Sequence, residues 1–287
     1  MLKRTITGVC LAAVVLAVIG LQGYVFIGAF TAALLLGMHE VLDALKQAKS
    51  RPVEWVVYLY GIALGAAQAA VLARGGGMVQ SLAVSQLVLA CCTMLVFGAV
   101  VLHGRVDMDA ISSTLFPMAY PGMFYAAIFP MNLIEGRMLT AVALVLTFFV
   151  ANLNDLFALL VGVKFGRHKL SPQISPKKTV EGSAAGLAAA VAVSVILPFA
   201  IQWLFSVIPA LNAYVQPLPS WWKFAIMGLF AGAASQFGDL AASLIKRHCG
   251  VKDFGSIFPG HGGIMDRIDG VLFSGVVILI FFMMTGA

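Results

Sequence analysis

Charged side chains are scarce in this 287-residue chain, where Asp, Glu, Lys and Arg together make up only 10% of the sequence. Apolar residues make up 61%, and the mean hydropathy is strongly positive. Soluble domains contain about 45–50% apolar residues and cover them with polar ones. Because this chain has too few polar residues to cover its apolar surface in water, the composition excludes a soluble globular protein and predicts residence in a bilayer.

Cysteine is also rare, and this absence excludes two further classes. The four cysteines are Cys10, Cys91, Cys92 and Cys249, and their spacing matches neither a zinc site nor the disulfide framework of a secreted protein. The apolar amino terminus could be mistaken for a signal peptide. It lacks a convincing small-residue cleavage site and runs straight into another apolar segment, so we predict a retained first span.

Apolar runs of the length needed to cross a bilayer, about 20 residues each, recur throughout the chain. They cover approximately residues 5–21, 24–45, 53–73, 82–103, 111–134, 138–163, 183–208, 222–245 and 268–286. The fifth run contains Pro117, Pro121 and Pro130, which predict a kinked or broken helix. We therefore predict an all-α polytopic bundle of about nine transmembrane helices with a polar site facing the cytoplasm.

The spacing of these runs leaves no room for a soluble domain between them. We expect one integral membrane domain over residues 1–287, with N-terminal helices in 1–135. The second half, 136–287, carries both long polar loops, and we expect the chemistry there.

The basic residues are distributed unevenly across the predicted loops. With the amino terminus inside, all of the 18 Lys and Arg residues except Arg74, Arg137 and Lys223 fall on the cytoplasmic side. The loops 164–182 and 246–267 then share that side. The net charge of +6 suits anionic lipid headgroups and nucleotide phosphates, so no nucleic-acid partner is needed. We expect the protein in the inner membrane of a bacterium.

The segment SLIKRHCGVKDFGSIFPGHGGIMDRID, residues 243–269, gathers an unusual number of ionisable groups around five glycines. Carboxylates suit a divalent cation, basic side chains suit phosphates, and glycines such as Gly260, Gly262 and Gly263 allow close backbone approach. This combination favours phosphoryl or nucleotidyl transfer at a membrane surface. These ionisable residues include Lys246, Arg247, Lys252, Asp253, His261, Asp266, Arg267 and Asp269. His261 is open to two interpretations, a phosphate contact or a tight turn.

Carboxylates inside membrane spans are costly and usually functional. Asp155 and Asp239 are each predicted near the cytoplasmic end of a span, while Asp266 and Asp269 share one face at the start of the last span. Four converging carboxylates could hold Mg²⁺, which prefers oxygen ligands. Alternatively, Asp155 and Asp239 only lock helices together. Glu40 and Asp43, near the end of the second span, are expected at the membrane interface, with contact to the site as the alternative.

The loop 164–182 ends in hydroxyl and basic side chains immediately before a predicted helix. Ser175, Lys177, Lys178 and Thr179 could bind an anion there, since a helix amino terminus with nearby lysines attracts negative charge. The alternative is a solvated loop whose lysines only enforce the topology.

Two motifs together resemble a known family. The pattern S-x-x-K-R-x4-K-D-x-G-x2-F-P-G-H-G-G-x2-D-R-x-D, from Ser243 to Asp269, is similar to the signature of the phosphatidate cytidylyltransferases, or CDP-diacylglycerol synthases. The stretch F-G-R-H-K-L-S-P-x-I-S-P-x-K-T-x-E-G, within 164–182, resembles the second block of that family. We refer to residues 243–269 as the signature segment.

The resemblance implies an enzyme that joins phosphatidate to CTP, giving CDP-diacylglycerol and pyrophosphate. It implies Mg²⁺ as cofactor, K⁺ in several members, an all-helical membrane bundle, and a homodimer with a cytoplasmic site. The catalytic candidates are Asp239, Lys246, Arg247, Asp266 and Asp269. The substrate-binding candidates are Ser175, Lys177, Lys178, Thr179, Ser243, Lys252, Gly260, His261, Gly262, Gly263 and Arg267. Asp239 and Asp266 are the first-choice metal ligands, followed by Asp269, Asp155 and Asp253.

Two departures from the family pattern leave alternatives open. Ala242 stands where the family usually has glutamate, and Leu159 stands where it tends to have tyrosine. The chain could therefore be a divergent paralogue acting on another phosphorylated lipid, or an inactive scaffold. A transporter or channel is disfavoured, because it predicts polar residues along a path to the outer face, and the outer loops are nearly bare of charge.

Overall fold

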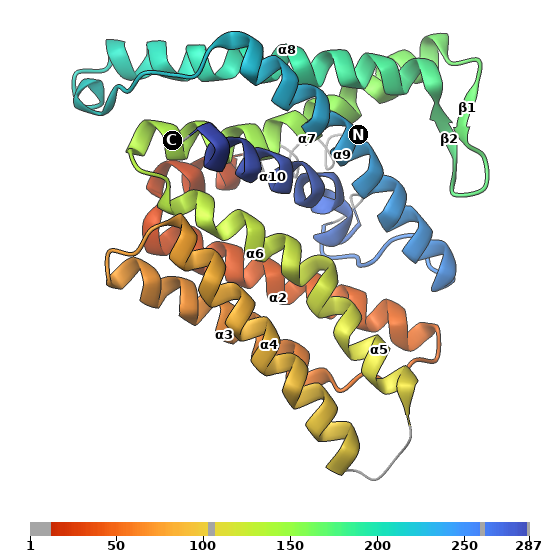
Figure 1. The fold of residues 1–287 in the computed structure, drawn as a ribbon. Coiled ribbons are helices and arrows are strands. Elements are labelled where there is room, and N and C mark those ends of the chain that lie inside the picture. The colour runs from red at the N-terminus through yellow and green to blue at the C-terminus, as the bar shows by residue number, and fades with distance from the viewer. Residues whose placement is uncertain (1–12, 103–106, 259–261, 286–287) are drawn as a thin grey trace. The chain divides into compact units, whose positions relative to one another are not determined.

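The computed structural model describes residues 13–102, 107–258 and 262–285, and over these ranges the protein is almost entirely helical (Figure 1). The long helices are α2 (Gly23–Gln47), α3 (Glu54–Ala73), α4 (Met78–Leu102), α7 (Arg137–Phe165), α8 (Val180–Val207), α9 (Trp221–His248) and α10 (Met265–Thr285). These seven helices are long and apolar enough to cross a membrane. The prediction of an all-helical polytopic membrane protein is confirmed.

The surface of these helices supports a lipid environment. Large apolar side chains are freely exposed, with Leu102 87%, Val163 80% and Met284 83% accessible. Surfaces of this kind are unfavourable in water and favourable against acyl chains.

Two of the nine predicted spans differ from the other seven. The first, 5–21, begins outside the described residues, although residues 13–21 are helical. The fifth is broken into α5 (Met108–Pro117), the π-helical turn η1 (Met118–Met123), α6 (Phe124–Ile128) and the 3₁₀ turn η2 (Phe129–Leu133). Tyr120 has non-helical backbone angles (φ −131°, ψ 108°) directly before Pro121, as the restriction on residues preceding proline requires. The predicted break in this segment is confirmed.

The polar loop after α7 folds into a short hairpin. Strands β1 (Lys169–Ser171) and β2 (Ser175–Thr179) pair antiparallel, with Lys169 opposite Thr179. Figure 1 shows this hairpin beyond the ends of α7 and α8. The Thr179 hydroxyl accepts a hydrogen bond from Gly182 N at 3.2 Å and caps the first turn of α8, so the helix expected after this loop is present.

The chain divides into two compact units. Unit 1 comprises residues 1–133 and 245–268, and unit 2 comprises residues 134–244 and 269–287. The divisions fall within α9 and α10, so most of the signature segment clusters with the N-terminal helices. The sequence places a boundary near residue 135, but it does not predict this return of the chain to the first unit.

Each unit has its own core. In unit 1, Phe30 packs against Phe26, Tyr125 and Phe129, with ring centroids 4.7–5.6 Å apart. In unit 2, α7 and α8 approach closely because Gly182 and Gly186 lie against the backbone of α7, where any Cβ would collide.

Candidate functional site

Asp266 lies at the start of α10 and organises the signature segment within unit 1. Its Oδ1 accepts a hydrogen bond from Lys246 Nζ at 2.7 Å, and its Oδ2 accepts the backbone N–H groups of Phe254 (2.8 Å) and Gly263 (3.0 Å). Only 5% of the Asp266 side chain and 12% of the Lys246 side chain are exposed. The Asp266 carboxylate therefore connects Lys246 of α9 to two points of the loop that precedes α10, Phe254 and Gly263.

Glu40 is a second buried carboxylate in the same place. It is only 3% exposed, and its two oxygens accept the backbone N–H groups of Ile264 and Met265, both at 2.9 Å. These two amides lie at the start of α10, where a helix leaves N–H groups without helical partners. The predicted position of Glu40 at the membrane interface does not anticipate this role.

Three glycines of the signature segment lie against these carboxylates. A Cβ on Gly255 or Gly263 would overlap the carboxylate oxygens of Glu40. Gly262 has φ +82°, a conformation that favours glycine, and a Cβ there would lie 2.8 Å from Asp266 Oδ2. Gly262 and Gly263 thus lie against protein carboxylates, and the predicted approach of their backbone to phosphates stays a prediction.

The remaining signature residues differ in exposure. Ser243 is half-buried on α9. Cys249 is a buried free thiol, and burial raises its pKa. Gly260 and His261 lie outside the described residues. Four charged side chains are exposed to solvent: Arg247, Lys252, Asp253 and Arg267.

Unit 2 holds the other group of predicted residues. The Lys178 ammonium, from β2, pairs with Asp239 Oδ2, from α9, and about a quarter of each side chain is exposed. Ser175 begins β2 opposite Ser171, and Lys177 is exposed. A predicted phosphate-binding lysine thus contacts a predicted metal ligand.

A buried polar network ties three helices of unit 2 together near Asp239. Asn154 Nδ2 donates to Gly232 O at 2.9 Å, and Gln236 Nε2 donates to Asn154 Oδ1 at 2.9 Å and to Ser183 O at 2.9 Å. The Ser183 hydroxyl donates to Gln236 Oε1 at 2.5 Å. This network joins α7, α8 and α9. Asn154, the residue before Asp155, therefore locks the helices together, a role that the sequence analysis considered for Asp155.

The two other aspartates have contrasting positions. Asp155 is exposed on α7, while Asp269 is 7% exposed on α10 and accepts the N–H of Gly270 at 2.8 Å. At the two positions that depart from the family pattern, Leu159 is 63% exposed and Ala242 is fully buried. A glutamate at position 242 would therefore have to displace its neighbours.

The donor chemistry of these carboxylates fits a hard cation such as Mg²⁺. Within the described residues, neither unit gathers three or more His, Cys, Asp or Glu side chains closely enough to hold a metal ion. Instead, an ammonium group balances Asp239 and another balances Asp266. A carboxylate offers about four lone-pair positions, and three hydrogen bonds already reach Asp266. Asp239, which is more exposed, is the better candidate.

Sequence reasoning missed Ser183 and Gln236, and it considered contact of Glu40 with the site only as the alternative to a position at the membrane interface. A signal existed for Glu40, because a carboxylate seven residues from the end of a long apolar helix is costly unless it has partners. Single polar residues such as Ser183 and Gln236 give no comparable signal, since one of either type is common in a membrane helix.

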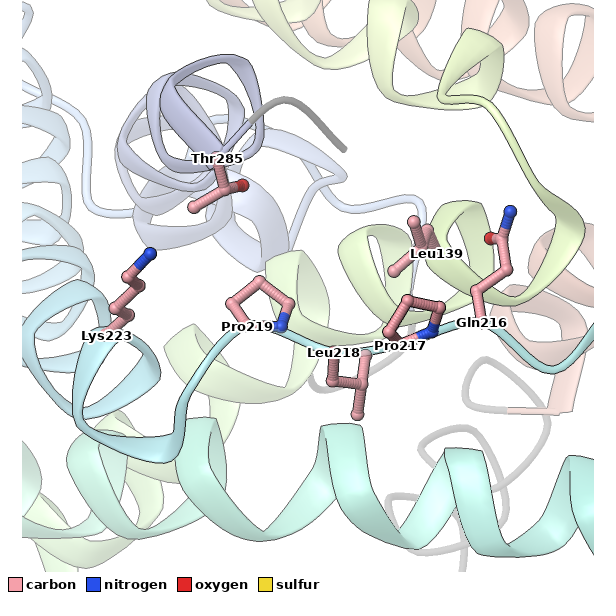
Figure 2. A pocket seen from close by; sticks show the side chains of 7 residues that line it. All are labelled: Leu139, Gln216, Pro217, Leu218, Pro219, Lys223 and Thr285. Carbon is pink, nitrogen blue, oxygen red and sulfur yellow. The ribbon is translucent and has the colours of Figure 1, made fainter.

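A hollow in unit 2 contains none of the predicted site residues. It measures about 320 Å³ and is lined by Leu139, Gln216, Pro217, Leu218, Pro219, Lys223 and Thr285. Figure 2 shows these side chains around the start of α7, the start of α9 and the end of α10. The hairpin follows the other end of α7, so within unit 2 the hollow is separate from the hairpin.

Several curated proteins are similar to this chain. It is 28% identical over 287 aligned residues to the phosphatidate cytidylyltransferase of Mycobacterium bovis, covering 94% of this chain and 84% of that protein. It is 28% identical to phosphatidate cytidylyltransferase 4, chloroplastic, of Arabidopsis thaliana, covering 96% of this chain and 71% of that protein. Phosphatidate cytidylyltransferase 5, chloroplastic, from the same plant is 40% identical, but over only 50% of this chain and 33% of its own length.

The family model extends beyond the signature segment. The model described as the cytidylyltransferase family matches residues 2–285 and therefore takes in both units, the hairpin and the signature segment. Because that match covers nearly the whole sequence, this chain belongs to the cytidylyltransferase family.

Proposed function

We propose that this protein is a CTP:phosphatidate cytidylyltransferase of phospholipid biosynthesis. The observation that supports this most is the family match over residues 2–285, combined with relatives of that name aligned over more than nine-tenths of the chain. The membrane helices suit a lipid substrate, and the exposed basic residues of the signature segment suit a triphosphate.

The proposed reaction is an in-line displacement. A phosphate oxygen of phosphatidate attacks the α-phosphorus of CTP. A new P–O bond forms as the bond to the α,β-bridging oxygen breaks, and pyrophosphate leaves with that electron pair. The attacking group is already anionic, so the protein needs no strong general base. Its main contributions are positioning and the stabilisation of negative charge.

Each group of residues has a proposed role. Arg247, Lys252 and Arg267 would contact the triphosphate, where arginine can make bidentate contacts and lysine supplies a point charge. Lys177 and Lys178 of the hairpin would bind a phosphate. Lys246 would keep Asp266 and the signature segment in place.

Mg²⁺ would be held by Asp239, with Asp266, Asp269, Asp155 and Asp253 as further candidates, and would neutralise phosphate charge. To admit the cation at Asp239, Lys178 would have to release its ion pair, which would leave its ammonium group available for an anion. We further propose an inner-membrane location with the amino terminus and the site on the cytoplasmic side, and a homodimer.

The test is an assay of the purified protein in detergent with CTP, phosphatidate and Mg²⁺, following pyrophosphate. Asp239→Asn should abolish turnover and leave the protein folded. The control is Asp43→Asn, since Asp43 is 44% exposed and pairs with His39 and Lys46 at the surface, where ion pairs contribute little. Full activity of the Asp239→Asn variant would remove Asp239 from the mechanism.

The same assay separates the alternative functions. Ala242 and Leu159 alter the surroundings of Asp239 and Asp155, so phosphatidate should be compared with other phosphorylated lipids. Turnover with a different lipid alone would identify a divergent paralogue. CTP binding without turnover on any of them would indicate an inactive homologue.

A further inference from the structure

The Glu40 carboxylate is enclosed by the signature segment, although more than 200 residues separate the two along the chain. It lies on α2, where Gly37, one turn earlier, also faces this segment: a Cβ on Gly37 would lie 3.7 Å from Met265 Sδ and 3.8 Å from Ile264 Cγ2. The same face of α2 therefore contacts the start of α10 through packing at Gly37 and through hydrogen bonds at Glu40.

A carboxylate buried in an apolar helix costs free energy unless its oxygens are hydrogen-bonded. Both oxygens of Glu40 have such partners, and both partners are backbone N–H groups of consecutive residues, Ile264 and Met265. This geometry fixes the position and the direction of the backbone where the loop enters α10. A side-chain partner could rotate, but two consecutive peptide groups can satisfy one carboxylate only in a narrow range of orientations.

The glycines of the loop complete this arrangement. Gly255 and Gly263 both lie against the Glu40 carboxylate, from opposite ends of the loop, and neither position has room for a Cβ. Their small size is thus explained by contact with Glu40.

We infer that Glu40 is a positioning residue for the cytidylyltransferase reaction: it clamps the signature segment to α2 through the amides of Ile264 and Met265, and it requires glycine at positions 255 and 263. Asp266 fixes the loop to α9, and Glu40 fixes the loop to α2. The exposed residues Lys252 and Arg267 lie on either side of the clamped glycines in sequence, so loss of the clamp should misplace them. The catalytic part of this inference rests on the proposed function, whereas the clamp itself does not.

Hydrogen exchange tests the clamp directly. In the full-length protein in detergent, Glu40→Ala should increase amide exchange at Ile264 and Met265 at least tenfold. Glu40→Gln, which keeps one accepting oxygen but turns an NH₂ group toward the other amide, should increase exchange mainly at one of the two. Asp43→Asn, on the next turn of the same helix, should change neither. Unchanged exchange at both amides in Glu40→Gln and Glu40→Ala would overturn the inference.

A double substitution tests the requirement for glycine. Gly263→Ala should lower the midpoint of thermal unfolding, because its methyl group meets the Glu40 carboxylate. In the Glu40→Ala background that group is gone, so adding Gly263→Ala should lower the midpoint by less than half as much. Gly98→Ala is the control, since a Cβ on Gly98 in α4 meets nothing within 4 Å. Equal effects of Gly263→Ala in both backgrounds would show that Glu40 does not set this requirement.

Kinetics distinguish positioning from simple stabilisation. Glu40→Gln should lower kcat at least tenfold per folded molecule, since misplacement of catalytic groups by about 1 Å can cost a hundredfold in rate. A role in stability alone would lower the unfolding midpoint and leave kcat unchanged, which would contradict the positioning role. If the wild-type protein does not turn over CTP, the proposed function fails, and the exchange measurement still decides whether Glu40 clamps the loop.

Discussion

Asp239 and Asp266 are both candidate metal ligands, and their carboxylates have different surroundings. Asp266 is 5% exposed and accepts three hydrogen bonds, two of them from the backbone of the loop that it closes. Asp239 is 24% exposed and pairs with one lysine from a hairpin. At the scale of single residues, Asp266 connects the loop of the signature segment to α9, and Asp239 is more accessible to a ligand.

Substitution by asparagine should separate these roles. Removing one partner of a buried ion pair costs about 3–5 kcal/mol, so Asp266→Asn should lower the free energy of unfolding by about 3 kcal/mol. About a quarter of each side chain in the Asp239–Lys178 pair is exposed, and contact with water weakens an ion pair, so Asp239→Asn should lower the free energy of unfolding by less than Asp266→Asn does. Reversible unfolding in detergent measures both. A large loss of stability in Asp239→Asn, with little in Asp266→Asn, would reverse this assignment.

At the scale of secondary-structure elements, helices α7, α8 and α9 are joined by both packing and hydrogen bonds. Asn154 of α7 is fully buried and forms hydrogen bonds with two residues of α9, the carbonyl of Gly232 and the side chain of Gln236. Gln236 in turn donates a hydrogen bond to the carbonyl of Ser183 on α8. Gly186 leaves room for Asn154, since a Cβ at position 186 would collide with it. This network supports the helix that carries Asp239.

Truncation of Asn154 should therefore weaken unit 2. Hydrogen bonds between membrane helices contribute on average about 0.6 kcal/mol and at most about 1.7 kcal/mol each, and Asn154→Ala removes two. We expect a loss of about 1–2 kcal/mol in the free energy of unfolding. Asn152→Ala, on the exposed side of the same helix, removes only a bond to Phe148 O and should cost much less. Equal losses in the two variants would contradict the role given to the network.

The elements also show where prediction from sequence succeeds. Long apolar runs predict the seven long apolar helices of the described residues, because a bilayer requires that length, and the prolines at positions 117, 121 and 130 indicate the break. The β1–β2 hairpin is not predicted, because its pairing depends on Thr179 and Lys169 meeting across a turn and leaves no periodic pattern in so few residues.

The candidate site is only partly predictable for a related reason. Local spacing in the motifs makes Asp239, Asp266 and their basic neighbours candidates. It cannot identify Glu40, whose role depends on a contact with Ile264 across most of the chain. Gly263 is equally far from Glu40 along the chain, so its contact with that carboxylate cannot be predicted from the motif. For this reason the sequence analysis predicts a phosphate contact for Gly263.

At the scale of the whole molecule, the charge distribution predicts the orientation in the membrane. The hairpin and the signature segment carry most of the basic residues of the second half, whereas the loop 209–220 carries no charge. The two motifs should therefore face the same compartment.

Cysteine labelling can test this orientation. In a variant without the four native cysteines, single replacements would be made at three exposed sites: Gln173, Ala213 and Ser256. An impermeant maleimide should label only Ala213→Cys in intact spheroplasts, and only Gln173→Cys and Ser256→Cys in inside-out vesicles. If Gln173→Cys and Ser256→Cys are labelled from opposite sides, the predicted topology is wrong.

The most direct test of the proposed activity follows the α-phosphate of CTP. The purified protein would be given phosphatidate, Mg²⁺ and CTP carrying a radioactive α-phosphate. We expect the label to move into CDP-diacylglycerol and unlabelled pyrophosphate to be released in equal amount. Label that stays in CTP, with phosphatidate and with every other phosphorylated lipid supplied, would contradict it.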